Sequence, residues 1–239
     1  YHHTFSSVKF DHVSNLKYTI NRIIMVEVNL LKSLPTGKRN IKAREQAKTA
    51  EHIRISREYG MEYFDGSRNY GYGGYYYDSR WVPVAKDIIE HFDLKPGDKV
   101  LDVGCAEGFL VKDLLAEGIN AFGVDVSEYA LMNCEPAVIG RLEISSAEKL
   151  PFQDNSFDAV LAINSIHNLP RNLCLEAVQE IERLAPGKGF IQVDSYLTEE
   201  DKKLFESWVL TALYYGYPDK WIALFNQPEY TGDWNWTVL

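Results

Sequence analysis

Cysteine is scarce in this chain of 239 residues. The three cysteines, Cys105, Cys134 and Cys174, are far apart and form no C-x-x-C pair. An odd, scattered set argues against a disulfide framework and against a cysteine zinc site, and it is typical of a reducing compartment. We therefore expect a cytoplasmic protein without a bound metal.

Long hydrophobic runs are also absent. The longest candidate, 20-INRIIMVEVNLL-31, is interrupted by Arg22, Glu27 and Asn29, and it is shorter than the roughly 18 apolar residues that span a bilayer. The first residues show no positive start followed by an apolar core and a small-residue cleavage site. The sequence thus predicts neither a membrane span nor a signal peptide.

Positive charge is short over most of the chain. Residues 1–60 carry 11 Lys and Arg against 5 Asp and Glu, whereas residues 61–239 carry 14 against 29. A nucleic-acid surface needs clustered positive charge, so the acidic main part disfavours one. The basic first part either contacts an acidic partner or lies on the acidic body of its own chain, and the second reading is the simpler.

Helical patterns fill the first part of the chain. Apolar or amphipathic spacing predicts helices over residues 14–34, 41–60 and 82–94. We therefore expect a helical extension over residues 1–60, which offers a surface for a homo-oligomer.

After residue 95, expected strands alternate with expected helices. The strands are expected at 100–104, 119–126, 142–144, 157–164, 190–194 and 230–239. The helices are expected at 109–118, from Ser127, at 172–184 and within 208–225. Such alternation predicts βαβ units and a parallel sheet, hence an α/β fold.

The strongest local signal is 100-VLDVGCAEGFL-110, an apolar strand that runs into a glycine turn and then a helix. Gly104 permits the sharp turn, Gly108 allows close approach to the backbone, and the start of the helix presents free N–H groups. Asp125 follows Gly104 by 21 residues, at the end of the next expected strand. A carboxylate there can accept both hydroxyls of a ribose, although Asp125 could instead cap the next helix. The motif predicts a cofactor that contains a nucleoside.

Four ordered segments resemble class I S-adenosylmethionine-dependent methyltransferases. They are 100-VLDVGCAEG-108, 123-GVDVS-127, 146-SAEKLPFQDNSFDAVLAI-163 and 184-LAPGKGFIQVD-194. The resemblance spans about residues 84–195. It implies a Rossmann-like, seven-stranded, mostly parallel sheet with helices on both faces, and S-adenosylmethionine as the cofactor. The whole pattern is also similar to bacterial small-molecule methyltransferases of surface-polysaccharide gene sets.

The resemblance implies a set of cofactor-binding positions. They are Asp102, Gly104, Cys105, Ala106, Gly108, Asp125, Val126, Ser146, Ala147, Glu148 and Asn164. Ala106 replaces a usual glycine, which we expect to be a mild change because alanine tolerates most backbones with negative φ. Ser146 replaces the usual aspartate beside adenine, and its hydroxyl can still accept a hydrogen bond without charge.

The stretch 71-GYGGYYYDSRW-81 precedes this region and concentrates aromatic rings. We expect residues 61–83 to form a lid over the cofactor, ahead of a methyltransferase domain at residues 84–239. The expected substrate-binding residues are Tyr70, Tyr72, Tyr75, Tyr76, Tyr77 and Arg80. Tyrosine faces favour a cation, and an arginine favours a carboxylate. The alternative is a Tyr-rich loop that packs on the domain surface.

Two residues at the ends of expected strands are candidate general bases. His167 follows the fourth strand and Asp194 ends the fifth, and carboxyl ends of strands face the ligand crevice of α/β sheets. Either residue could instead have a purely structural role. A base contributes about 3–5 kcal/mol, less than the roughly 7–11 kcal/mol of positioning. We expect methyl transfer to an oxygen or nitrogen of a small molecule, such as a sugar, an amine or a phosphorus-containing metabolite. The alternatives are an RNA methyltransferase that uses the basic first part, or a non-catalytic protein that binds S-adenosylmethionine.

Overall fold

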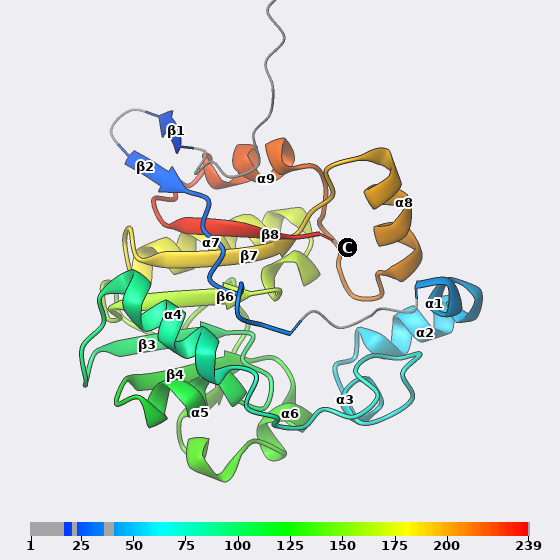
Figure 1. Ribbon diagram of the computed structural model, residues 1–239, viewed down its shortest axis with the longest axis horizontal. Coiled ribbons are helices and arrows are strands. Elements are labelled where there is room, and N and C mark those ends of the chain that lie inside the picture. The colour runs from blue at the N-terminus through cyan, green and yellow to red at the C-terminus, as the bar shows by residue number, and fades with distance from the viewer. Residues whose placement is uncertain (1–16, 21–22, 36–40, 239) are drawn as a thin grey trace, which may run out of the picture.

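The computed structural model describes residues 17–20, 23–35 and 41–238 (Figure 1). The strands are β1 (Lys17–Ile20), β2 (Ile23–Val26), β3 (Lys99–Val103), β4 (Asn120–Asp125), β5 (Leu142–Ile144), β6 (Ala159–Ile163), β7 (Gly189–Asp194) and β8 (Asp233–Thr237). The α-helices are α1 (Ile41–Ala47), α2 (Ala50–Ser56), α3 (Met61–Phe64), α4 (Val82–Phe92), α5 (Phe109–Ala116), α6 (Glu128–Met132), α7 (Arg171–Leu184), α8 (Glu199–Trp208) and α9 (Pro218–Phe225). Short 3₁₀ helices are η1 (Pro136–Val138) and η2 (Ile166–Asn168).

Strands β3 to β8 form one sheet in the order β5-β4-β3-β6-β7-β8, and each adjacent pair is parallel. The chain builds outward from β3 to β5 and then returns to β6 on the other side of β3. Strand order therefore reverses between β3 and β6, where an α/β sheet opens a ligand crevice at its carboxyl edge. The predicted α/β architecture is confirmed, although the described sheet has six strands and not the expected seven.

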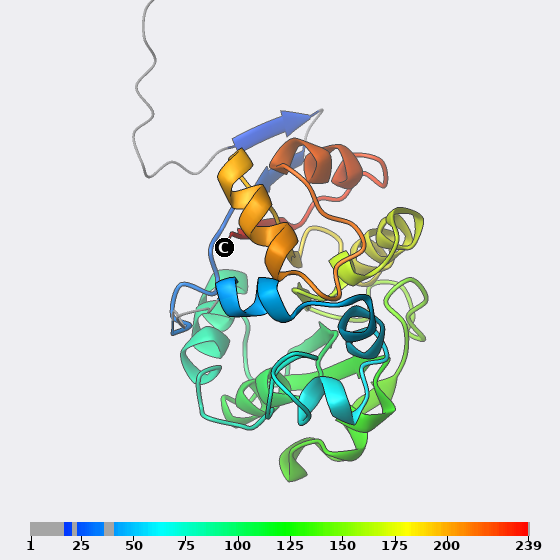
Figure 2. The ribbon, with the colours of Figure 1, turned by 90° about the vertical axis from the view of Figure 1, so that its right-hand side faces the viewer.

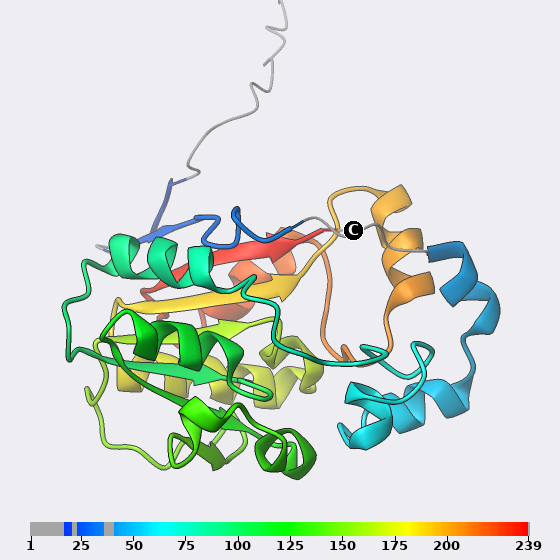
Figure 3. The same ribbon diagram turned by 60° about the horizontal axis from the view of Figure 1, so that its bottom comes forward.

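Both faces of the sheet are buried, which explains the apolar runs of its central strands. Along β3, Leu101 and Val103 belong to a core that includes α7 and α9, whereas Val100 belongs to a core with α4 and α5. This alternation follows from the two-residue period of a strand. Figure 3 shows the helix layers on the two sides of the sheet. Trp221 of α9 and Trp234 of β8 are fully buried in the first core, so these C-terminal aromatic residues are core residues.

The expected helix over residues 14–34 is wrong within the described part of that segment. Strands β1 and β2 pair there as an antiparallel hairpin, followed by an irregular stretch. The isoleucine pair and the valine of β2 are β-branched, and such side chains fit a strand better than a helix. Val28 donates to the main-chain oxygen of Trp234 at 2.9 Å. The segment after the hairpin thus covers the outer edge of β8 and protects it from pairing with other chains.

The expected helix over residues 41–60 is divided into α1 and α2. Thr49 interrupts it by capping α2, because its hydroxyl oxygen accepts a hydrogen bond from the N–H of His52 at 3.2 Å. None of the described helices is both long and apolar enough to cross a membrane.

Helix α8 lies next to α1 (Figure 2) and was not predicted from the sequence. Its signal is a capping box formed by Thr198 and Asp201. Lys48 donates to a main-chain oxygen of α8 at 2.5 Å, and Arg44 lies 4.6 Å from the ring centre of Trp208. At these positions the basic first part rests on its own chain. A homo-oligomer formed through α1 and α2 stays a prediction.

Residues 57–81 connect α2 to α4 across the carboxyl edge of the sheet (Figure 3). Two hydrogen bonds attach this segment to the start of α6. Ser127 Oγ donates to the main-chain oxygen of Tyr59 at 2.6 Å, and the hydroxyl of Tyr129 donates to Asp65 at 2.7 Å. The aromatic segment is thereby held over the sheet edge.

Candidate functional site

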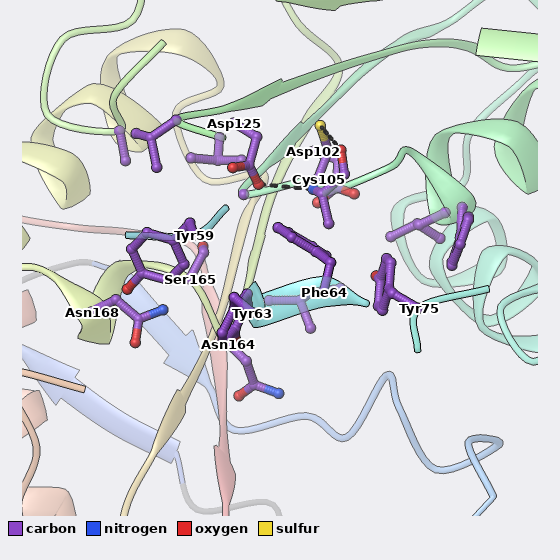
Figure 4. A pocket seen from close by; sticks show the side chains of 18 of the residues that line it. Tyr59, Tyr63, Phe64, Tyr75, Asp102, Cys105, Asp125, Asn164, Ser165 and Asn168 are labelled. Atoms are coloured by element: carbon purple, nitrogen blue, oxygen red, sulfur yellow. Dashed lines mark hydrogen bonds between the residues drawn. The ribbon is translucent and has the colours of Figure 1, made fainter. Parts of the chain in front are cut away.

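A cavity opens at the carboxyl ends of β3, β4 and β6, where the strand order reverses (Figure 4). The turns after these strands form one side of it, and the segment that leads into α4 forms the other. The lining residues are Tyr59, Tyr63, Phe64, Tyr72, Tyr75, Trp81, Asp102, Val103, Gly104, Cys105, Ala106, Phe109, Leu110, Asp125, Val126, Ser145, Ser146, Ala147, Ile163, Asn164, Ser165, Asn168 and Leu169.

Gly104 makes the sharp turn after β3. Its φ is +86°, in the left-handed region that favours glycine. A Cβ at this position would lie 2.3 Å from the Cβ of Ser165, which follows β6. Gly108 caps the start of α5 with a φ of +79°, and a Cβ there would lie 2.9 Å from Val138. Gly104 lines the cavity. Gly108 does not, but its missing side chain lets the start of α5 pack closely against Val138.

Ala106 lies between these glycines, and the expectation of a mild replacement is wrong. Its φ is +49°, a left-handed conformation that costs an L-residue roughly 1–2 kcal/mol. A glycine would adopt this backbone freely. The N–H of Ala106 donates to Asp125 Oδ2 at 2.8 Å, and this hydrogen bond holds the strained turn in place.

Asp125 ends β4 and receives two main-chain hydrogen bonds. Its Oδ2 accepts from Ala106 and its Oδ1 accepts from Ser127, each at 2.8 Å. Burial raises the pKa of this carboxyl, and the main-chain bonds lower it in part. A carboxylate accepts up to about four hydrogen bonds, so two acceptor positions remain for a ligand. The cap of α6 is Ser127, whose Oγ accepts from Ala130 N at 3.0 Å, and capping therefore does not account for Asp125.

Asp102 lies in β3 and reaches the cavity with only 6% of its surface exposed. Burial and, second, the charge of Asp125 raise its pKa to about 7. The neighbouring Cys105 thiol also has a raised pKa, mainly from burial, and it remains neutral. A cation in the cavity would favour the ionised form of Asp102.

The raised pKa of Asp102 predicts a loss of stability as pH rises. Between about 3.9, the usual value for aspartate, and about 7, the folded protein holds a proton that the unfolded chain has released. In that window this group lowers the free energy of unfolding by up to about 1.4 kcal/mol per pH unit. Asp102→Asn should therefore match the wild type near pH 4 and unfold at a higher temperature at pH 8. Thermal unfolding from pH 4 to pH 8 measures this, and a difference that is constant across the range would contradict it.

Beyond Asp125, the cavity wall is formed by Val126, Ser146 and Ala147. Val126 is apolar yet 50% exposed, so it offers a free surface for a flat ring. The Ser146 hydroxyl donates to the carboxylate of Glu148, which leaves the hydroxyl oxygen able to accept. Glu148 does not line the cavity, and its carboxylate accepts the hydrogen bond from Ser146.

Aromatic rings line the side of the cavity opposite the glycine turn. Tyr75 stacks on Phe109 of α5 with ring centres 4.7 Å apart, and Tyr72 lies 4.4 Å from Tyr75. Burial raises the pKa of the Tyr63 and Tyr75 phenols well above the usual value, so both remain neutral. Of the six expected substrate residues, the structure places Tyr72 and Tyr75 at the cavity.

The other four expected substrate residues do not line the cavity. Tyr70 packs against a histidine ring of α2, and Tyr76 is 72% exposed. Tyr77 donates to an aspartate of α5 at 2.6 Å, and Arg80 forms an ion pair with the aspartate two residues before it. We therefore no longer assign these four to the substrate. The segment has no regular period, so its sequence could not distinguish inward from outward rings.

His167 and Asp194 bind each other and do not line the cavity. His167 Nδ1 accepts from the N–H of Asp194 at 3.1 Å, and Nε2 lies 3.4 Å from the Asp194 carboxylate. Burial lowers the pKa of the His167 ring, and the Asp194 charge opposes this only in part. The main-chain oxygen of His167 accepts from Leu213 and Tyr214. These contacts give both residues a structural role, and we no longer propose either as the general base.

Several lining residues were missed from the sequence. They are Tyr59, Tyr63, Phe64, Trp81, Val103, Phe109, Leu110, Ser145, Ile163, Ser165, Asn168 and Leu169. The residues after β6 could have been found by position, because Asn164 was expected at that same strand end. Asn164 lines the cavity, and its Oδ1 accepts from Thr237 at 2.7 Å. Within the described residues, no group of three or more His, Cys, Asp or Glu could hold a metal ion.

Comparison with known proteins agrees with this geometry. The family model "Methyltransferase domain" matches residues 101–193. Cycloartenol-C-24-methyltransferase 1 of Oryza sativa subsp. japonica is 30% identical over 149 residues, 54% of this chain and 43% of that protein. Demethylmenaquinone methyltransferase of Symbiobacterium thermophilum is 31% identical over 130 residues, 48% of this chain and 50% of that protein.

The solved structure of S-adenosylmethionine-bound CalS10, an amino pentose methyltransferase from Micromonospora echinaspora, has a TM-score of 0.40 and 23% identity. The match covers 45% of this chain and 48% of that one. This chain thus spans half or less of the length of each of these three proteins. The matched domain carries the glycine turn, Asp125 and the central parallel strands. Residues 101–193 of this chain are thus similar to a methyltransferase domain, and the two relatives named above are methyltransferases.

Proposed function

We propose that this protein transfers a methyl group from S-adenosylmethionine to an oxygen or nitrogen of a small molecule. One observation carries the proposal: a cavity at the strand-order reversal joins the Gly104 turn and Asp125 on one side with neutral aromatic rings on the other. The first side has the features that a nucleoside and its attached chain require. The second side is available to another small molecule.

The residues of the first side fit the cofactor. Asp125 has acceptor positions left for two ribose hydroxyls, and Val126 and Ala147 offer apolar surface for adenine. The Ser146 hydroxyl donates its hydrogen bond to Glu148. Its oxygen can therefore accept a hydrogen bond from the adenine amino group. Asp102 and the neutral Tyr75 ring lie in the same cavity and favour a cation. When bound, S-adenosylmethionine supplies an electrophilic methyl group whose carbon–sulfur bond breaks with the electron pair left on sulfur.

Positioning is the main catalytic contribution that this site offers. The described lining residues include no histidine, lysine or glutamate. Holding two reactants in line can supply roughly 7–11 kcal/mol, more than the roughly 3–5 kcal/mol of a general base. The chain therefore acts by binding and orienting the acceptor, and the proton that the acceptor loses passes to water.

We also propose that residues 61–83 act as a lid. Tyr63, Phe64, Tyr72, Tyr75 and Trp81 come from this segment and line the cavity. Hydrogen bonds attach the segment to α6, and ring stacking attaches it to α5. A lid of neutral rings would exclude water while the acceptor is bound.

An acceptor assay tests the function. The protein should transfer tritium from methyl-labelled S-adenosylmethionine to members of a panel of amino sugars, hydroxylated sugars and small amines. At a subsaturating cofactor concentration, Asp125→Ala should lower the transfer by at least about tenfold, and Glu128→Ala, an exposed charge change nearby, should not. Label in RNA only would instead establish the RNA methyltransferase alternative. Cofactor binding with no transfer to any acceptor would establish the non-catalytic one.

A further inference from the structure

Two buried polar atoms at the cavity have no hydrogen-bond partner among the described residues. They are Ser165 Oγ and Asn168 Oδ1, and both residues line the cavity. A buried polar atom without a partner destabilises the folded state, so most such atoms are hydrogen-bonded in folded proteins. Two such atoms beside one cavity therefore indicate that a ligand completes their hydrogen bonds.

The chemistry of these atoms restricts the ligand group. Asn168 Oδ1 is a carbonyl oxygen and only accepts, so it requires an N–H or O–H from the ligand. Ser165 Oγ can accept the same proton or donate its own. An ether, an ester or a carbon nucleophile offers Asn168 no such proton. A hydroxyl or an amine does.

Charge around the cavity restricts the ligand further. Among the described lining residues, the charged types are the two aspartates Asp102 and Asp125, and there is no lysine or arginine. Arg80, the expected partner of an anion, is bound to its neighbouring aspartate outside the cavity. A phosphate or carboxylate beside these side chains would have no countercharge. A neutral or cationic group avoids the free-energy cost of burying an anion without a countercharge.

Asn168 lies where η2 meets the segment that crosses the sheet edge. It ends η2, and the main-chain oxygen of the preceding His167 binds the segment at Leu213 and Tyr214. Arg57, two residues before the cavity-lining Tyr59, donates to the main chain of the same segment at Ala212. In Figure 4, Asn168 lies beside Tyr59, on the opposite side of the view from Cys105 and Tyr75.

We propose that Asn168 Oδ1, supported by Ser165 Oγ, holds the nucleophilic N–H or O–H of a neutral or cationic acceptor. This rests on the proposed methyl transfer and specifies its substrate: a hydroxyl or amine compound, not an anionic or carbon acceptor. In the transfer, a lone pair of that oxygen, or of that nitrogen in its unprotonated form, forms the new bond to the methyl carbon; any positive charge of the acceptor lies on another of its atoms. The methyl–sulfur bond breaks with its electron pair left on sulfur, and the acceptor's proton goes to water.

Binding of two cofactor analogues tests the proposal without the acceptor. S-adenosylhomocysteine has no group at the methyl position, whereas sinefungin carries an amine there. The wild type should bind sinefungin at least about tenfold more tightly, as expected for a charge-assisted hydrogen bond. Asn168→Leu, which keeps the size but removes the oxygen, should remove this preference and leave affinity for S-adenosylhomocysteine unchanged. Asn168→Asp, which keeps an acceptor oxygen, should retain or increase it.

Each outcome of the calorimetric titrations has a distinct meaning. If Asn168→Leu lost affinity for both analogues equally, Asn168 would bind the cofactor itself, and the proposal would be overturned. A preference that persists in Asn168→Leu would overturn it as well. Failure of the wild type to bind either analogue would contradict the proposed function itself. Thermal unfolding of both Asn168 variants shows whether either is misfolded. Ser165→Ala then replaces a misfolded variant, and it should reduce the preference for sinefungin by half or more.

Discussion

Gly104→Ala should destabilise the protein by about 2–5 kcal/mol and abolish cofactor binding. The new Cβ would lie 2.3 Å from the Cβ of Ser165, and the residue would have to hold a φ of +86°. The left-handed backbone costs roughly 1–2 kcal/mol, and overpacking adds roughly 1–3 kcal/mol. Relief of the collision would move the turn after β3 away from β6, into the space that the cofactor needs. Urea unfolding and titration with S-adenosylhomocysteine measure the two effects.

Two substitutions separate the causes of this loss. Gly140→Ala is the matched control, because its φ is +80° and no atom lies within 4 Å of the added Cβ. Gly140→Ala should lower the free energy of unfolding only by the strain of the left-handed backbone, roughly 1–2 kcal/mol. Ala106→Gly, two residues after Gly104, should have the opposite sign and stabilise the protein by about 1 kcal/mol. If Gly104→Ala were no worse than Gly140→Ala, the close contact with Ser165 would not matter.

Asp125→Ala should weaken binding of S-adenosylhomocysteine by at least about tenfold. The substitution removes the acceptors for the ribose, and hydrogen bonds to a charged group contribute roughly 1.5–3 kcal/mol. It also removes the acceptor for Ala106 N–H, which holds the strained turn at a φ of +49°. The two effects act in the same direction, so Asp125 should be among the most sensitive positions for binding.

Asp125→Asn distinguishes charge from shape at this position. Asparagine keeps one acceptor oxygen, so affinity should fall less than in the alanine variant. Glu128→Ala removes a nearby exposed charge outside the cavity and should leave the affinity unchanged. Isothermal titration calorimetry compares all three variants with the wild type. Wild-type affinity in a folded Asp125→Ala variant would show that the cofactor binds elsewhere.

The side of the cavity that carries Gly104 and Asp125 was predictable because its signals are local. A strand, a glycine turn, a helix and an acidic residue at the next strand end lie within 26 residues, from Val100 to Asp125. Parallel strands bring their carboxyl ends to one edge, so the order of the motifs alone places Gly104, Asp125 and Asn164 together. The same reasoning could not foresee the φ of Ala106, because a residue type restricts a backbone angle without setting it.

The aromatic side was predictable only in outline. The sequence shows that many rings precede α4, but their direction depends on contacts with distant residues. Tyr75 is turned inward by stacking on Phe109, whereas Tyr77 is turned away by its hydrogen bond to Asp113. His167 shows the same limit, because its ring binds Asp194 beneath the surface and does not reach the cavity.

By itself, the sequence determined the α/β architecture and the resemblance to methyltransferases, because periodicity and short-range spacing encode strands, turns and helix starts. Only the tertiary structure decided which side chains line the cavity. That choice depends on contacts between segments such as residues 59–81, 164–169 and 211–214, which are far apart in the chain and have no shared pattern. The unpartnered oxygens of Ser165 and Asn168 became visible only once these segments were in place.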